Sequence, residues 1–223
     1  MVKKGVILPV RKPTDFVSNI VPVRKRNGRL RVCLDPIHLN KALKRNSHPM
    51  KRCEQIRARL TGARYFTALD ADEGFWQLSL DRESSMLCTF ATPWGRYRFL
   101  KMPFGVLTAP DEFQRVTDEI FCGLDGVTVV VDDILVWGRT REERDARLRA
   151  VLQRCEEVGM VLNKKSQFAR DSVRYLGHVL MLEGLKIDED RIKSIQAFPA
   201  PANVKQLQQF LGISWKKKAV CNC

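Results

Sequence analysis

The amino-acid sequence predicts an α+β protein. Strand-like and helix-like stretches alternate irregularly, without the repeated βαβ order of a parallel α/β protein. A long amphipathic helix with signals at both ends follows Gly138. Residues 127–137 form an almost unbroken run of β-forming side chains, which two adjacent aspartates interrupt. These features predict one packed unit in which sheets and helices share a core.

The first sixty residues predict short strands, a hairpin and a helix. Strand-like runs cover residues 5–10, 20–23 and 30–34. Asn27-Gly28 separates the second run from the third, and this dipeptide is a strong signal for a tight hairpin turn. A helix is predicted near residues 53–60.

The middle of the chain predicts further strands and then a helix. The strands are predicted over residues 64–70 and 75–80, and over a pair at 85–92 and 97–102 that turns at Pro93-Trp94-Gly95. A helix is predicted to begin at Thr108, with Pro110 in its first turn, and to end near Gly123.

The helix after Gly138 has the clearest boundaries. Thr140 and Glu143 have the spacing of a capping box, and Gly159 is placed to end the helix. The predicted buried stripe comprises Leu148, Val151, Leu152, Cys155 and Val158. A strand over residues 175–182 and helices over 188–197 and 204–211 are predicted to follow.

The composition predicts a nucleic-acid partner. Lys and Arg number 39 against 25 Asp and Glu, which gives a net charge of +14, and basic side chains neutralise phosphates. The alternative is a solvated surface that is merely basic. The seven cysteines are scattered without a C-x-x-C pair, which predicts reduced thiols. No apolar run is long enough to cross a bilayer, and we expect an intracellular, cytoplasmic chain without membrane contact.

Asp132 and Asp133 are the first candidates for chemistry. A continuous strand through residues 127–137 would bury at least one charge. Burial costs roughly several kcal/mol unless the charge is paired or bound to a metal. A hairpin turn at Asp132-Asp133 avoids burial but places two like charges at one tip. Such local conflicts are expected at functional sites. The alternative is an ordinary exposed Asp-Asp turn.

Asp70 is the third candidate, because it ends the predicted strand 64–70 after an otherwise uncharged stretch. Alone, it is more readily interpreted as a turn residue. If it lies beside Asp132 and Asp133, the three carboxylates make an oxygen cluster suited to Mg²⁺ or Mn²⁺. Two such ions stabilise the attacking and leaving oxygens in phosphoryl or nucleotidyl transfer.

The sequence closely resembles the reverse transcriptases of gypsy-class LTR retrotransposons, which are similar to retroviral ones. The resemblance covers residues 5–213 almost without gaps, in the family's order, and its most specific segments are ARYFTALDADEGFWQL, FATPWGRYRFLKMPFGVLTAPDEFQ, VVVDDILVWG and YLGHVL. It implies a right-hand polymerase fold with an RNA-directed DNA polymerase activity. The implied partners are an RNA or DNA template with a primer, and deoxynucleoside triphosphates. The implied cofactor is a pair of Mg²⁺ or Mn²⁺ ions at Asp70, Asp132 and Asp133.

The resemblance also assigns nucleotide-binding residues. Arg31 and Lys25 take the positions of the fingers residues that contact the triphosphate, where a guanidinium fork and a mobile ammonium both suit phosphate. Phe75 takes the position of the aromatic ring that packs under the sugar and leaves no room for a 2′-hydroxyl. Phe104 and Gly105 match the segment beneath the nucleotide and the template base. Without the resemblance, these residues are a basic turn, a core aromatic and a simple loop.

The resemblance implies fingers at residues 1–45 and 78–107, a palm at 46–77 and 108–182, and a partial thumb at 183–214. Residues 215–223 depart from the family and are expected to be an unrelated tail, so the chain is expected to be truncated at both ends. Val130 replaces an aromatic residue of the family, which predicts reduced activity.

Two alternatives to an active polymerase remain. One is a non-catalytic relic of a retroelement that binds nucleic acid or a partner protein. The other is a metal-dependent nuclease, which would leave Phe75, Arg31 and the Pro-Phe-Gly segment unexplained.

Overall fold

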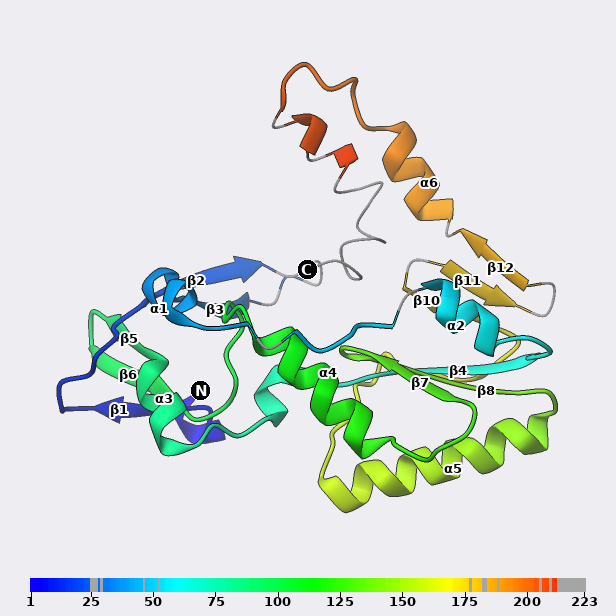
Figure 1. Ribbon diagram of the computed structural model, residues 1–223, viewed down its shortest axis with the longest axis horizontal. Coiled ribbons are helices and arrows are strands. Elements are labelled where there is room, and N and C mark those ends of the chain that lie inside the picture. Colours follow the sequence, from blue (N-terminus) through cyan, green and yellow to red (C-terminus); the bar gives the residue numbers. More distant parts are fainter. Residues whose placement is uncertain are drawn as a thin grey trace. The chain divides into compact units, whose positions relative to one another are not determined.

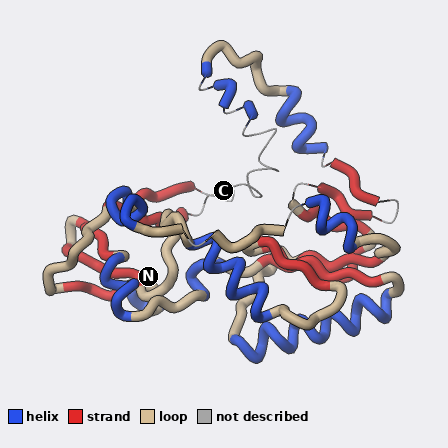
Figure 2. The backbone as a smooth tube through the Cα atoms, in the orientation of Figure 1, coloured by secondary structure: helices blue, strands red, loops and turns tan. Residues whose placement is uncertain are grey.

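The computed structural model describes residues 1–24, 28, 30–45, 47–51, 53–176, 178–181, 184–187, 189–204, 206–208 and 210–211. Helices and strands are mixed along the chain, which confirms the predicted α+β class (Figures 1 and 2). Within these residues, no helix has both the length and the apolar content needed to cross a membrane. Lys25 and the tail at 215–223 lie outside the described residues.

The chain forms two compact units. Unit 1 comprises Met1–His48 and Glu73–Val116, and unit 2 comprises Pro49–Asp72 and Thr117–Cys223. The predicted boundaries between fingers and palm follow residues 45, 77 and 107. The boundaries between the two units follow residues 48, 72 and 116. The functional names of the two units stay predictions.

Unit 1 contains two antiparallel sheets. One has the strand order β1-β6-β5, and the other is the β2–β3 hairpin. The elements that lie wholly in this unit are η1 (Val2–Lys4), β1 (Ile7–Val10), β2 (Asn19–Arg24), β3 (Leu30–Asp35), α1 (Ile37–Ala42), η2 (Gly74–Gln77), α3 (Arg82–Leu87), β5 (Thr89–Thr92) and β6 (Gly95–Phe99). Helix α4 (Ala109–Ile120) begins in unit 1 and ends in unit 2.

Unit 2 contains a four-stranded sheet of order β7-β8-β4-β9 and a three-stranded sheet of order β10-β11-β12. The elements are α2 (Cys53–Arg59), β4 (Tyr65–Asp70), β7 (Val127–Val130), β8 (Asp133–Gly138), α5 (Arg141–Val158), β9 (Gln167–Arg170), β10 (Ser172–Tyr175), β11 (His178–Met181), β12 (Gly184–Ile187) and α6 (Glu189–Gln196). All the strand pairs within the two sheets are antiparallel.

The four-stranded sheet of unit 2 is covered on both faces. Ile134 and Val136 of β8 face a core that includes Val151 and Cys155 of α5, the helix that runs along this sheet in Figure 1. Leu135, between them, faces a second core that includes Ile56 of α2 and residues of β10 and β11. Because side chains of a strand alternate between faces, a run of apolar residues is what a doubly covered strand requires.

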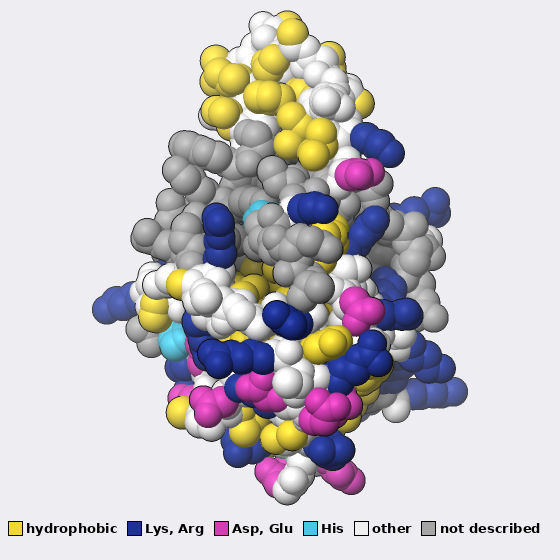
Figure 3. Space-filling view, turned by 90° about the vertical axis from the view of Figure 1, so that its right-hand side faces the viewer, with side chains coloured by type: hydrophobic (Ala, Val, Ile, Leu, Met, Phe, Trp, Pro, Cys, Tyr) yellow, Lys and Arg dark blue, Asp and Glu magenta, His cyan; other side chains and the backbone are white. Residues whose placement is uncertain are grey.

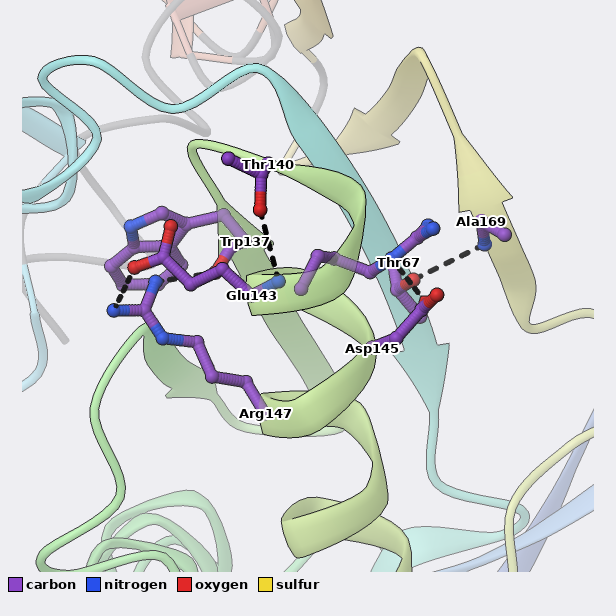
Figure 4. A network of polar contacts seen from close by, with 8 residues as sticks. Thr67, Trp137, Thr140, Glu143, Asp145, Arg147 and Ala169 are labelled. Carbon is purple, nitrogen blue, oxygen red and sulfur yellow. Dashed lines mark hydrogen bonds and ion pairs between the residues drawn. The ribbon is translucent and has the colours of Figure 1, made fainter.

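Helix α5 has the bounds that the sequence predicts, and its N-terminus has one additional hydrogen bond. The Thr140 hydroxyl accepts from the Glu143 N–H at 3.2 Å, as predicted, and Gly159 ends the helix in the left-handed conformation. The Glu143 carboxylate accepts from the Arg139 N–H at 2.6 Å and also interacts with the backbone N–H of Thr140. It pairs with Arg147 at 2.7 Å (Figure 4). Both contacts of the predicted capping box are therefore present, and the Arg139 N–H is an additional donor to Glu143.

The buried stripe of α5 is narrower than predicted. Val151 and Cys155 are buried, whereas Leu152 and Val158 are exposed. The buried face also includes Arg144, a charged residue that the apolar pattern could not indicate. Its Nε lies 2.8 Å from the Asp145 carboxylate (Figure 4).

One predicted strand is wrong, and another begins later than predicted, at Thr89. The segment predicted as the strand 75–80 begins with η2, because Glu73 adopts a positive φ of 49° and the chain turns, with a 2.7 Å hydrogen bond from the Trp76 N–H to the Glu73 carbonyl. The first residues of the strand predicted over 85–92 belong to α3, which Asp81 caps by accepting from the Ser84 N–H at 2.7 Å. In both places, local turn and cap signals outweigh β propensity.

Candidate active site

Two of the predicted carboxylates face each other at the ends of paired strands. Asp70 is the last residue of β4 and Asp133 is the first residue of β8, and the antiparallel register places them directly opposite each other. The third, Asp132, precedes Asp133, and its carbonyl oxygen accepts a 2.9 Å hydrogen bond from the N–H of Ala71. The structure therefore brings the backbones of all three predicted residues together in unit 2.

The turn lies one residue earlier than predicted. Because Val130 pairs with Asp133, the two central turn residues are Val131 and Asp132, rather than Asp132 and Asp133. Val131 has a φ of +53°, a conformation that is strained for a β-branched residue. Glycine is the usual residue at such a position, so the chain holds a strained residue beside its aspartates.

Asp133 lies in an environment that disfavours a lone negative charge. Burial, together with the charge of Asp70, raises the pKa of the Asp133 carboxyl to about 6. Its carbonyl oxygen accepts a 3.3 Å hydrogen bond from the Tyr175 hydroxyl, which comes from β10. Val130, opposite Asp133, is buried in the core below. The carboxylate is thus held in a packed setting where a cation would lower the electrostatic cost.

The donor set of this cluster consists of carboxylate oxygens, the ligand type that Mg²⁺ and Mn²⁺ prefer. In the described part of the chain, no three His, Cys, Asp or Glu side chains are already arranged as a metal site. The residue types therefore fit hard divalent cations.

Three of the predicted nucleotide-binding residues form one contiguous group in unit 1. The Arg31 guanidinium carbon lies 4.3 Å from the centre of the Phe104 ring. The Phe104 ring in turn lies 4.9 Å from that of Phe75, and Phe75 lies 5.5 Å from Phe113 of α4. Phe75 is buried, as its aromatic neighbours require, and it lies in η2 rather than in the predicted strand.

Gly105 continues this group and is fixed by close backbone packing. Its φ is +106°, and a Cβ at this position would lie 1.9 Å from the carbonyl oxygen of Leu34. The adjacent Phe104 carbonyl accepts a 2.7 Å hydrogen bond from the Leu34 N–H, which attaches β3 to this segment. Only glycine satisfies both the φ value and the close approach.

The sequence interpretation missed Asn40, which supports the same segment. Its side-chain amide donates to the Gly105 carbonyl at 3.0 Å, and its side-chain oxygen accepts from the Leu107 N–H at 2.9 Å. An asparagine inside α1 was the available signal, because asparagine is a poor residue for a helix interior and often bonds to backbone elsewhere.

Residues 23–180 match the family model described as reverse transcriptase (RNA-dependent DNA polymerase). The chain therefore belongs to the reverse transcriptase family.

Individual relatives agree with this family. The enzymatic polyprotein of Cestrum yellow leaf curling virus is 34% identical over 95% of the chain, and the retrovirus-related Pol polyprotein from transposon opus of Drosophila melanogaster is 32% identical over 96%. A solved foamy viral protease-reverse transcriptase, in complex with double-stranded DNA, matches with a TM-score of 0.86 and 26% identity over 95% of the chain. This chain spans 34%, 22% and 37% of those three proteins.

Proposed function

We propose that this chain is the catalytic core of an RNA-directed DNA polymerase, which adds deoxynucleotides to the 3′-hydroxyl of a primer on an RNA or DNA template. The observation that carries the proposal is the placement of Asp70 opposite Asp133, with Asp132 in the adjoining turn. The resemblance to reverse transcriptases implies that aspartates at these positions are the metal ligands of the reaction.

Asp70, Asp132 and Asp133 would hold two Mg²⁺ or Mn²⁺ ions. Bound ions of this kind neutralise charge and stabilise the attacking and leaving oxygens in nucleotidyl transfer. The chain's own contribution is to fix the ligands. The ladder between β4 and β8 sets Asp70 against Asp133, and the hydrogen bond from Ala71 to the carbonyl oxygen of Asp132 fixes the turn.

Arg31, Phe75, Phe104 and Gly105 would bind the incoming nucleotide. The Arg31 guanidinium stacks on Phe104 and carries donors suited to a triphosphate. Phe75 is held by rings on two sides, and a fixed ring can exclude a 2′-hydroxyl by volume alone. Lys25 is proposed as a second phosphate contact on the resemblance alone.

We further propose that the chain derives from a gypsy-class retrotransposon. The similarity to the Pol polyprotein of a Drosophila transposon supports this origin. The enzymatic polyprotein of Cestrum yellow leaf curling virus is similar to the chain to a comparable degree.

Primer extension on RNA and DNA templates, with Mg²⁺ or with Mn²⁺, tests the function. The Asp70→Asn and Asp132→Asn variants should lose extension to background, because an amide is a poorer ligand for hard cations. The matched control is Asp125→Asn, an exposed aspartate before β7, which should retain activity. Circular dichroism should show that all the variants are folded. Activity in the Asp70→Asn variant would overturn the proposal.

A steric test addresses Phe75. Trimming it to Val should raise the use of ribonucleotides relative to deoxynucleotides, because the smaller side chain leaves room for the 2′-hydroxyl. The measurement is the ratio of kcat/KM for the two sugars. An unchanged ratio would show that Phe75 has no role in sugar selection.

Val130 favours a second candidate, a nucleic-acid-binding module without synthesis. Valine offers less contact area than the aromatic residue of the family, and here it is buried in the core. Binding of a primer–template without extension in either metal would support this candidate over the polymerase.

A further inference from the structure

The positive charge of the protein is concentrated in unit 1. Residues 1–48 contain twelve Lys and Arg but only two Asp and Glu, whereas residues 73–116 contain five of each, so unit 1 has a net charge of +10. Unit 2 therefore carries only +4 of the total of +14. On the face drawn in Figure 3, basic and acidic side chains are intermixed. A polyanion is therefore attracted first of all to unit 1.

The turn between β5 and β6 presents a tryptophan to solvent on this basic unit. Trp94 is 85% exposed, the largest value among the exposed large hydrophobic side chains that the structure describes. Most tryptophans in folded proteins are largely buried, because the indole ring has a large apolar surface. The exposed indole offers a ligand an aromatic face on which to stack.

The backbone of this turn is fixed. Thr92 pairs with Gly95 in the ladder, so Pro93 and Trp94 form a two-residue turn, and the proline ring restricts φ at its first position. The Thr92 hydroxyl donates to the Gly95 carbonyl at 2.7 Å and accepts from the Trp94 N–H at 3.3 Å. These contacts fix the backbone position of Trp94 at the end of the sheet.

Basic side chains lie beside the turn. The register pairs Val10 of β1 with Arg96 of β6, so Arg11 and Lys12 continue past the strand at the end where Trp94 lies. Within the described residues, the side chains of Arg11, Lys12 and Arg96 make no hydrogen bond or ion pair. Arg98, farther from the turn, differs because it donates to the Ser85 hydroxyl at 2.6 Å. The cations nearest the tryptophan are therefore available to a ligand.

We propose that Trp94, with Arg11, Lys12 and Arg96, forms a docking surface for single-stranded nucleic acid, on which an unpaired base stacks against the indole ring. A stacking ring among free cations is the arrangement that binds single strands without sequence preference. A duplex offers phosphates to the arginines but no unstacked base to the ring. The inference rests on the proposed function only in identifying the strand as the unpaired part of a template.

The test is the binding of a fluorescent (dT)20 oligonucleotide to the full 223-residue chain, followed by anisotropy. Trp94→Ala should weaken binding about tenfold, within the range found for removal of one base-stacking ring. Trp94→Phe should keep most of the affinity. Arg96→Ala should lower the slope of log K against log salt by about 0.7, because one phosphate contact to a single strand is lost. Leu8→Ala, at an exposed leucine of the same sheet, is the matched control and should bind as the wild type does.

An abasic oligonucleotide of the same length separates stacking from charge. The wild type and Trp94→Ala should bind this probe equally, because it keeps the phosphates and lacks the bases. Equal binding of (dT)20 by both proteins, or an equal loss on both probes, would overturn the inference. So would a Trp94→Ala variant that changes the sedimentation of the protein but not its binding of (dT)20, because the surface would then contact a protein. None of these measurements requires synthesis, so a failed polymerase assay leaves the inference standing.

Discussion

Two hairpins of this protein are built in opposite ways: β7–β8, which carries Asp132 and Asp133, and β2–β3, which carries Arg31. The β7–β8 hairpin in unit 2 is buried at every strand residue except Asp133. The β2–β3 hairpin in unit 1 has a longer ladder of six residue pairs, yet Leu34 is its only buried residue. Backbone pairing alone therefore does not explain the difference. The first hairpin is held by two cores, and the second is held mainly by its own ladder.

The comparison suggests how each hairpin serves its proposed role. Metal ligands must keep their positions within tenths of an ångström, and a hairpin packed on both faces provides that rigidity. A surface that meets a charged ligand needs exposed cations more than a core. The exposed hairpin is still attached at one end, because the N–H of Leu34 donates to the carbonyl of Phe104 and Gly105 packs against the Leu34 carbonyl.

The largest expected effect is in the buried hairpin. Leu135, in the middle of β8, is 0% exposed, and Leu135→Ala should lower the free energy of unfolding by about 2–5 kcal/mol through lost burial and the cavity left behind. Urea denaturation followed by circular dichroism measures this change. In the exposed hairpin, Val21 is 45% exposed, and Val21→Ala should change stability by less than about 0.5 kcal/mol. Similar losses in the two variants would contradict the proposed difference between the hairpins.

The attachment of the exposed hairpin is tested at Gly105. Gly105→Ala places a methyl group against the Leu34 carbonyl and forces a residue with a side chain into a φ of +106°, so stability should fall by about 2–3 kcal/mol. Gly5→Ala is the matched control in the same unit. Gly5 also has a positive φ, of 65°, but open space surrounds it, so only the backbone cost of about 1 kcal/mol is expected. Equal losses in the two variants would mean that the close approach to Leu34 adds no constraint.

The smallest expected effect concerns α5, which covers one face of the buried hairpin. The hydrogen bond from the Arg139 N–H and the charge of Arg147 lower the pKa of Glu143. A carboxyl group with a lowered pKa in the folded state stabilises the fold above its unfolded pKa, and the stabilisation is lost as the pH falls through the folded pKa. Glu143→Gln should therefore lower the Tm slightly at pH 7 and leave it unchanged near pH 3.

The control for this variant is Glu156→Gln, an exposed glutamate in the last turn of the same helix. It should leave the Tm unchanged at both pH values. A loss in Glu143→Gln that is the same at pH 3 and pH 7 would show that the glutamate acts through packing rather than through its charge.

Local signals predicted much of the fold. The bounds of β4, α4 and α5 follow from propensity, caps and the apolar period, and Asn27-Gly28 correctly indicated the pairing of β2 with β3. The strand predicted at 75–80 failed because Phe75 and Trp76 are β-forming residues whose preference is outweighed by a turn at Glu73 and by burial among aromatic rings. The α3 helix was missed because β-forming neighbours obscured the cap at Asp81.

At the candidate site, too, the sequence and the tertiary structure determined different features. The sequence by itself determined which residues have the chemistry: Asp70 ends a strand of uncharged residues, and Asp132-Asp133 interrupt an apolar run, because adjacent carboxylates cannot be buried without compensation. Only the tertiary structure decided that Asp133, rather than Asp132, pairs with Asp70 and that Val131 takes the strained turn position. A one-residue shift in register exchanges the faces of a strand, and packing on both faces of the sheet, which no local pattern contains, selects one register.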